Sequence, residues 1–391
     1  MLFQTLAPEY NGGRALRHLF AIGRRSDSAL LKRELALRFV AGHVVLYSRG
    51  RSALAAAIRQ LMPEGKKQVA MSGLTCFSVE QAVTAAGYAP VFIDADMKTL
   101  QFGARELRQV LQTHPEIGVV VIQNHLGIPV DIAPIEKLCC DRGIKLIEDL
   151  AHSAGTVYPD GRVVGTVGDA AMLSFGRGKA IDVVSGGALL LRSQTATQKP
   201  TRRPSWLVQL QDRLYPLIGW IARSLYATRV GKYVFPLAFK LRLATRSADG
   251  EPDERLGLPA WQAKLARAQL RRLDKTASER AAHATMIKKL LAKQQFGAAF
   301  GDGAVPLRVP VLVRDRQNVL AKLAEQGLVL NDTWYDVPVG PPRLFGKSAY
   351  VAHSCPLAEK LAKHLLNIPT HAGVAAEELK KAIAIINQEL L

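Results

Sequence analysis

Residues 144–179 read IKLIEDLAHSAGTVYPDGRVVGTVGDAAMLSFGRGK, and this stretch decides both the fold class and the candidate chemistry. It holds two short apolar runs, 144–147 and 170–174, separated by a glycine-rich loop. Asp149 follows the first run and Lys179 follows the second. Because parallel α/β sheets present their ligand-binding groups at the carboxyl ends of the strands, both side chains are expected at one edge of a sheet.

The same pattern continues on both sides of this stretch. Short apolar runs alternate with helical patterns from residue 43 to about residue 192, which indicates α/β layering. The expected strands are 43–47, 68–71, 90–93, 118–123, 144–147, 170–174 and 188–191, with helices at 52–61 and 79–86. We therefore predict an α/β fold whose large domain has a mostly parallel, mixed sheet flanked by helices.

The C-terminal part predicts a smaller unit. A helical pattern runs from residue 259 to about residue 292, followed by a strand at 308–313 and helices at 317–326 and 376–390. A chain of 391 residues also exceeds the size at which a single core usually stops growing. We predict a large domain at 1–275 and a small C-terminal α+β domain at 276–391.

The composition is that of a folded enzyme, with 48% hydrophobic and 22% charged residues. No apolar run is long enough for a membrane span, and the first twenty residues lack the apolar run of a secretory signal, so we expect a cytoplasmic protein. The cysteines, Cys76, Cys139, Cys140 and Cys355, lack metal-site spacing and are expected to be reduced thiols, with no metal bound. The formal charge of +19 predicts attraction to phosphate groups on nucleic acid, an anionic membrane or a nucleotide-linked substrate.

Residues 195–252 form a basic, amphipathic insertion. The stretch 192–250 carries eleven Lys and Arg against Asp212 and Asp249 only. Apolar residues recur at helical spacing from 207 to 225, although Pro216 is expected to kink or divide that helix.

Three interpretations of this insertion remain open. In the first, 200–246 lies on anionic lipid, with its Trp and Tyr residues at the interface and Arg213, Arg223, Arg229 and Lys232 toward the headgroups. In the second, the apolar stripe covers a dimer interface or the domain core. The third is nucleic-acid binding, which is disfavoured because no recognised motif accompanies the charge.

The pair Asp149 and Lys179 is what an enzyme needs to hold a pyridine ring by its nitrogen and its aldehyde, which is the demand of pyridoxal phosphate chemistry. Gly50-Arg51-Ser52 opens a predicted helix whose N–H groups can hold a phosphate, and the Ser174 hydroxyl can add a contact. Each signal also has an ordinary explanation: a helix N-cap for the acid, a surface lysine, a glycine before a helix, and a buried serine.

In several segments the chain resembles the DegT/StrS-like aminotransferases, which are fold type I pyridoxal phosphate enzymes that aminate keto sugars attached to nucleotides. The similar segments, in order, are 50–54 (GRSAL), 74–75, 86–94 (AGYAPVFID), 126–131 (LGIPVD), 147–152 (IEDLAH), 165–179, 185–187, 268–270, 273–274 and 366–371 (LNIPTH). The resemblance covers most of the chain except about 195–252.

The resemblance implies a set of site residues and a cofactor, pyridoxal 5'-phosphate. Lys179 would be the Schiff-base lysine and proton shuttle, and Asp149 the partner of the pyridine nitrogen. Gly50, Arg51, Ser52 and Ser174 would hold the phosphate, Thr75, Cys76 and Phe77 would lie against the ring, and His152 would bond the phenolic oxygen. Four residues depart from the family pattern: Arg51 replaces threonine, Cys76 an aromatic residue, Asn124 a histidine and His152 a glutamine.

The expected function is transfer of an amino group from glutamate or glutamine to a keto sugar, nucleotide-linked or lipid-linked, in cell-surface polysaccharide or natural-product sugar biosynthesis. The resemblance also implies a homodimer. The alternative is a catalytically weak relative whose insertion serves docking on the inner face of the membrane or partner binding. The intact lysine and acid favour the enzyme.

Overall fold

The computed structural model describes residues 10–193, 198–228, 230–246, 248–296, 300–301, 303–330, 334–371 and 373–391. Its central feature is a 7-stranded sheet with the strand order β1-β8-β7-β6-β5-β2-β4. The strands are β1 (His43–Tyr47), β2 (Gln68–Ser72), β4 (Ala89–Ile93), β5 (Ile117–Gln123), β6 (Lys145–Asp149), β7 (Ala170–Ser174) and β8 (Gly187–Leu191). Pairing is parallel from β4 to β7, and β8 runs antiparallel to β1 and β7. The predicted mostly parallel, mixed sheet is confirmed.

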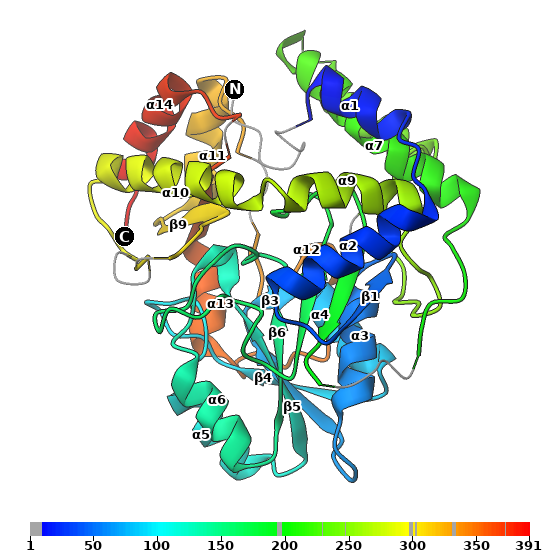
Figure 1. Ribbon diagram of the computed structural model, residues 1–391. Helices are drawn as coiled ribbons and strands as arrows, with labels where there is room; N and C mark the ends of the chain where they lie inside the picture. The colour runs from blue at the N-terminus through cyan, green and yellow to red at the C-terminus, as the bar shows by residue number, and fades with distance from the viewer. Residues whose placement is uncertain are drawn as a thin grey trace.

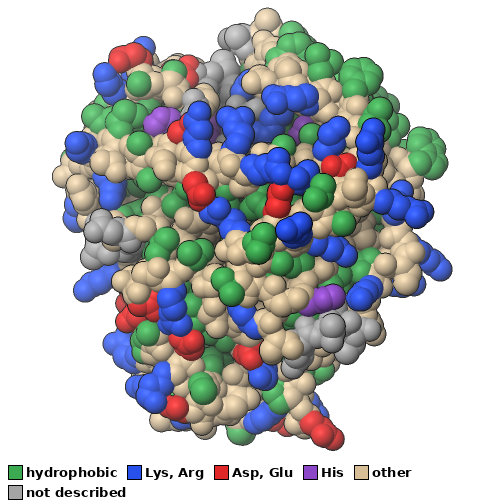
Figure 2. All heavy atoms as spheres, in the orientation of Figure 1, with side chains coloured by type: hydrophobic (Ala, Val, Ile, Leu, Met, Phe, Trp, Pro, Cys, Tyr) green, Lys and Arg blue, Asp and Glu red, His purple; other side chains and the backbone are tan. Residues whose placement is uncertain are grey.

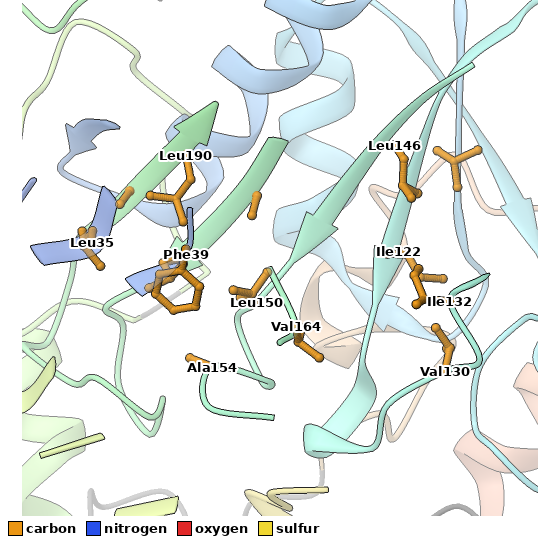
Figure 3. Close-up of a cluster of buried hydrophobic side chains, with 14 of the residues drawn as sticks. Leu35, Phe39, Ile122, Val130, Ile132, Leu146, Leu150, Ala154, Val164 and Leu190 are labelled. Carbon is orange, nitrogen blue, oxygen red and sulfur yellow. The ribbon is translucent and has the colours of Figure 1, made fainter. Parts of the chain in front are cut away.

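Helices cover both faces of the sheet, because side chains alternate between the faces along each buried strand. On one face, Ile122 and Leu146 share a core cluster with Leu35 of α2 (Arg25–Arg38) and with Phe39, which directly follows α2. Figure 3 labels several members of this cluster. This cluster also holds residues of α5 (Ala104–Thr113), α6 (Ala133–Asp141) and α9 (Ala260–Leu270). The other face packs against α3 (Gly50–Leu61) and α4 (Phe77–Ala85).

Glu148 and Asp149 are neighbours in β6 with different roles. Glu148 is fully buried and its carboxylate accepts four hydrogen bonds. The donors are the Tyr158 hydroxyl (2.8 Å) and the N–H groups of Gly165 (2.7 Å), Val167 (2.8 Å) and Gly168 (2.7 Å). Glu148 therefore anchors the loop that leads into β7, while Asp149 is left for the site.

Replacing Glu148 by glutamine is expected to destabilise the fold, because the new amide NH₂ would face donors and the charged acceptor would be lost. Hydrogen bonds to charged groups are each worth about 1.5–3 kcal/mol, so the free energy of unfolding should fall by roughly 3 kcal/mol. Urea denaturation followed by circular dichroism measures this change. Glu325→Gln, at an exposed position near the end of α11 (Arg316–Glu325), is the matched control. Equal stability of the two variants would contradict the anchoring role.

The C-terminal part forms its own cluster of buried residues from Ala284 onward. Its elements are α10 (Leu273–Leu290), β9 (Arg308–Leu312), α11, β10 (Val339–Gly340), α12 (Pro342–Phe345), α13 (Pro356–His364), β11 (Leu365–Pro369) and α14 (Ala376–Asn387). The helical pattern expected from 259 to about 292 is divided into α9 and α10. β10 pairs in parallel with β3 (Thr75–Cys76), which joins this part to the large sheet's loops. The domain division at 275/276 stays a prediction.

The insertion folds as α7 (Trp206–Ser224), the short 3₁₀ turn η2 (Tyr226–Thr228) and α8 (Gly231–Lys240). Figure 1 shows α1 (Gly12–Leu19) running along α7 at one end of the molecule. Pro216 does not divide this helix, because α7 continues through it, and the kink that was the other expected effect stays a prediction. A proline removes only its own N–H donor, and the buried neighbours Tyr215 and Ile218 hold this part of α7 in a core cluster. Within the described ranges, no helix combines the length and apolar character of a membrane span.

Candidate active site

Three parallel strands, β5, β6 and β7, and the start of α3 converge on one cavity. β2, β5, β6 and β7 end at Ser72, Gln123, Asp149 and Ser174 respectively. The last three of these residues line a cavity of about 190 Å³, and Lys179 lines it as well. The carboxyl edge of the sheet therefore brings together the acid and the lysine that the sequence singled out.

Asp149 is buried and held by two donors. Its Oδ1 accepts the Ala151 N–H (2.9 Å) and its Oδ2 accepts the Gln123 side-chain amide (3.1 Å). The Thr75 hydroxyl donates to Gln123 Oε1 (2.7 Å), which turns the amide NH₂ of Gln123 toward the carboxylate. Burial raises the pKa of Asp149, and these hydrogen bonds together with the Lys179 charge offset part of the rise. A cationic ring nitrogen is the kind of partner that such a carboxylate favours.

Lys179 lies on a tightly held loop after β7. The buried Asp182 carboxylate accepts the Gly178 N–H (2.9 Å) and the Tyr10 hydroxyl (2.7 Å). Gly178 has a φ of +72°, a left-handed conformation that glycine adopts without strain. Lys179 Nζ lies 4.5 Å from the centroid of the Trp334 ring. The loop thus fixes where the lysine enters the cavity.

The N-terminus of α3 forms an anion cradle at this cavity. No side-chain hydrogen bond caps the helix at Arg49, so its first N–H groups are not satisfied by a capping side chain. A Cβ on Gly50 would lie 3.2 Å from Ser174 Oγ, and a Cβ on Gly187 would lie 2.6 Å from Gly50 Cα. The absence of a Cβ at Gly50 and Gly187 therefore allows α3, β7 and β8 to lie closer together than larger residues at these positions would permit.

The structure places two predicted phosphate contacts differently. Arg51 lines the cavity, but its guanidinium donates to Gln81 Oε1 (2.7 Å) and to the carbonyls of Ala248 (3.0 Å) and Gly250 (2.9 Å). Burial lowers the pKa of Arg51 to about 10. Ser52 Oγ accepts the Asp253 N–H (3.1 Å) and is not part of the cavity wall. Both side chains hold the end of the insertion, because its backbone passes close to α3.

The three residues expected against a ring face are also separated. Cys76 lines the cavity and is exposed. Thr75 is fully buried behind the wall, where it orients Gln123. Phe77 points elsewhere, packing in a cluster with Val339 and Leu344. Of these three residues, Cys76 is the one that lines the cavity. Its small thiol takes the position where the family pattern has an aromatic ring.

His152 is enclosed by aromatic rings. It stacks on Trp334, with ring centroids 4.4 Å apart and an interplanar angle of 5°. The Leu126 N–H donates to His152 Nδ1 (3.3 Å), and the Tyr335 hydroxyl lies 3.1 Å from the same nitrogen. Burial holds the pKa of His152 well below its ordinary value, so the ring is neutral. With Nδ1 accepting, the proton sits on Nε2, which gives His152 the donor that a glutamine amide supplies.

The charges around the cavity favour an anionic ligand. Among the described lining residues, the basic side chains are Arg49, Arg51, Arg177 and Lys179, and Asp149 is the single acid. The sequence analysis missed Arg49, Arg177 and Gln123 as site residues. Arg177 was visible as a second cation in the quoted run, whereas Gln123 carried no signal beyond its position at a strand end.

The residues present fit pyridoxal 5'-phosphate. A phosphate matches the cradle at Gly50 and Ser174, a protonated ring nitrogen matches the buried Asp149 carboxylate, and an aldehyde needs an amine such as that of Lys179. His152 adds a neutral donor for the phenolic oxygen.

Two curated relatives illustrate what the sequence is similar to. The 3-amino-5-hydroxybenzoate synthase of Amycolatopsis mediterranei is 25% identical over 316 residues, covering 76% of this chain and 71% of the relative. The UDP-N-acetyl-3-dehydro-alpha-D-glucosamine 3-aminotransferase of Acidithiobacillus ferrooxidans is 22% identical over 375 residues, covering 95% of this chain and 90% of the relative.

The fold matches solved structures along almost the whole chain. PseC of Helicobacter pylori, an aminotransferase involved in the biosynthesis of pseudoaminic acid, has a TM-score of 0.70 at 16% identity, and the match covers 99% of this chain and 96% of that chain. The Streptococcus pneumoniae protein Spr1654 in its PLP form has a TM-score of 0.70 at 16% identity, covering 99% of this chain and 98% of that chain. The sequence matches one family over residues 22–203 and 254–387, so most of the insertion, residues 204–252, lies outside both ranges. The chain therefore belongs to the DegT/DnrJ/EryC1/StrS aminotransferase family, whose members depend on pyridoxal phosphate.

Proposed function

We propose that this protein transfers an amino group from glutamate or glutamine to a keto sugar linked to a nucleotide, acting as a cytoplasmic homodimer in polysaccharide or natural-product sugar biosynthesis. The observation that carries the proposal is the shared cavity of Lys179, Asp149 and the uncapped start of α3. The names of the sugar-nucleotide relative from A. ferrooxidans and of PseC support the acceptor class.

Each part of the site has a task in this reaction. Bound pyridoxal phosphate supplies the electron-withdrawing ring that lets an amino acid lose its α-proton. Lys179 Nζ takes that proton and returns it later in the transfer. The Asp149 carboxylate would hold the proton on the ring nitrogen, and His152 would donate a hydrogen bond to the phenolic oxygen. The N–H groups at the start of α3 would hold the phosphate.

The basic wall supports an acceptor that carries phosphate. Arg49 and Arg177 line the cavity beside the start of α3, which is assigned to the cofactor's phosphate, and Arg177 also donates to the Thr245 carbonyl (2.5 Å). Burial lowers the pKa of Arg49, and the Asp212 carboxylate opposes that shift while Arg177 reinforces it. Anions such as the donor carboxylate or a diphosphate neutralise two adjacent guanidinium groups, so the wall suits both substrates of the proposed reaction.

The test is an absorbance titration of the purified protein loaded with pyridoxal phosphate. Glutamate or glutamine should convert the visible band to the shorter-wavelength band of the aminated cofactor, and a nucleotide-linked keto sugar should restore it, with the amino sugar detected by mass spectrometry. Free keto sugars without a nucleotide are the matched control for the acceptor. A spectrum that no amino acid changes would contradict the aminotransferase proposal and favour the catalytically weak relative.

A further inference from the structure

The insertion and the N-terminal helix form a three-helix layer, with α7 in the middle. Gly12 lies beside Trp220, because a Cβ on Gly12 would lie 3.5 Å from the Trp220 ring. At the other end of α1, Arg213 donates to the Leu19 carbonyl (2.9 Å). α1 therefore runs antiparallel to α7. Gln211 donates to the Arg242 carbonyl (2.7 Å), which places the end of α8 beside the middle of α7. We call α1, α7 and α8 with their flanking residues the helical layer.

The inner side of the helical layer is already occupied. Tyr215, Ile218 and Phe235 are buried in a cluster that also includes Val184, next to the Lys179 loop. Ser185 donates to the buried Asp212 carboxylate (2.5 Å). The inner side of the helical layer therefore packs against the loop that follows β7, and the outer side faces away from it.

The outer side of α7 is apolar. Trp206, Leu210, Trp220 and Ile221 are 75%, 36%, 38% and 36% exposed. At 100° per residue they lie on the side of α7 opposite the buried Tyr215. A helix in a globular protein normally turns charged residues to this side. α7 is thus hydrophobic on both sides.

α8 and the end of α1 extend the same surface. Tyr233 and Leu237 of α8, and Leu241 directly after it, are 62%, 55% and 57% exposed and lie opposite the buried Phe235. Phe20, directly after α1, is 71% exposed. Because α1 is antiparallel to α7, Phe20 lies toward the Trp206 end of α7. Figure 2 shows hydrophobic side chains gathered along the part of the molecule where Figure 1 draws α1 and α7, with Lys and Arg beside them.

The charges that border this surface are basic. Lys232, Lys240 and Arg242 are exposed, and Asp212, buried and bonded to Ser185, is the sole acid between residues 206 and 246. Arg229, which the sequence placed with this group, lies outside the described residues. Trp and Tyr rings together with lysines are the composition that seats a protein in the headgroup region of an anionic bilayer.

We propose that the outer side of the helical layer docks on an anionic membrane surface, with its aromatic and leucine side chains in the headgroup region and Lys232, Lys240 and Arg242 near the lipid phosphates. A second copy of the chain fits less well, because a two-fold contact would set the basic residues of both copies together, and the sole acid between residues 206 and 246, Asp212, is buried. Nucleic acid fits less well because its interfaces are polar. This inference does not rest on the proposed reaction.

The experiment is flotation of the full-length protein with vesicles of phosphatidylcholine, with and without phosphatidylglycerol. The protein should float with the phosphatidylglycerol vesicles at about 0.1 M salt and much less at about 1 M salt, because salt screens the headgroup attraction. Reversing the three charges in K232E/K240E/R242E should weaken binding at least about 100-fold, since each basic residue contributes about 5-fold near such a surface.

The apolar contribution is tested separately by Tyr233→Ser, Leu237→Ser and Leu241→Ser combined, which should also abolish flotation. The matched control is Val351→Ser with Leu357→Ser, two exposed apolar residues outside the helical layer, which should float like the parent protein. Far-UV circular dichroism of each variant establishes that it is folded. Two outcomes overturn the proposal: failure of the parent protein to float with anionic vesicles, or flotation that the serine variants leave unchanged. If the parent protein fails to float and the serine variants dissociate a dimer, a second copy covers this surface instead.

Discussion

Replacing Lys179 by alanine is expected to abolish turnover and to remove the visible absorbance band of the lysine-bound cofactor. The side chain is the only amine among the described residues that line the cavity, and its loop is fixed by Asp182 and Tyr10. Loss of a positioned acid–base group alone costs about 10²–10⁴-fold in rate, and loss of the covalent link adds to that. Stopped-flow absorbance with glutamate measures both effects.

Two comparisons make the Lys179 result specific. Lys363→Ala, at an exposed position in α13, should retain full activity. Added methylamine should restore part of the Lys179→Ala activity, because a free amine can enter the space that the side chain leaves. A Lys179→Ala protein that keeps its visible band and its turnover would show that another amine carries the cofactor.

Replacing Asp149 by asparagine should leave the fold intact and slow the reaction strongly. Asparagine can still accept the Ala151 N–H, but it cannot hold a proton on the ring nitrogen. Removing the charge of a buried hydrogen-bonded pair costs roughly 2–5 kcal/mol. This corresponds to about 30- to 5,000-fold in kcat/KM for the amino donor.

The Asp149 prediction is checked by donor kinetics and by cofactor affinity measured from fluorescence quenching. Asp141→Asn, which alters an exposed acid at the end of α6, is the matched control and should change neither quantity. Activity of Asp149→Asn within a few-fold of the parent protein would mean that the ring nitrogen has another partner. The thermal midpoint of the variant should stay close to that of the parent, which separates a chemical defect from misfolding.

The sheet was predictable because its signal is local. Each strand from β5 to β8 is a short run that is almost entirely buried, and such runs are readable one at a time. Asp149 and Lys179 followed from the same signal, since they come after β6 and β7. The division of labour between Glu148 and Asp149 was not predicted, because it depends on which face of β6 each side chain takes.

The remaining site features depend on contacts between distant segments. The Arg51 guanidinium binds carbonyls at 248 and 250, and nothing near residue 51 in the sequence indicates these contacts. The pairing of β3 with β10 separates Thr75 from Cys76 by placing them on opposite sides of a strand that was not expected. The continuity of α7 through Pro216 was also not predictable, since it depends on the tertiary packing around Tyr215.

The hydrogen bonds of Arg51 and Arg177 to the end of the insertion have an evolutionary consequence. Arg51 donates to the carbonyls of Ala248 and Gly250, and Arg177 donates to the Thr245 carbonyl (2.5 Å). The Arg177 Cζ also lies 3.6 Å from the centroid of the Tyr215 ring in α7. A chimera that received residues 195–252 without these two arginines would lack the contacts that hold this segment against the rest of the protein. The segment and the two arginines should therefore be inherited together, and a lineage that loses one is expected to lose the other.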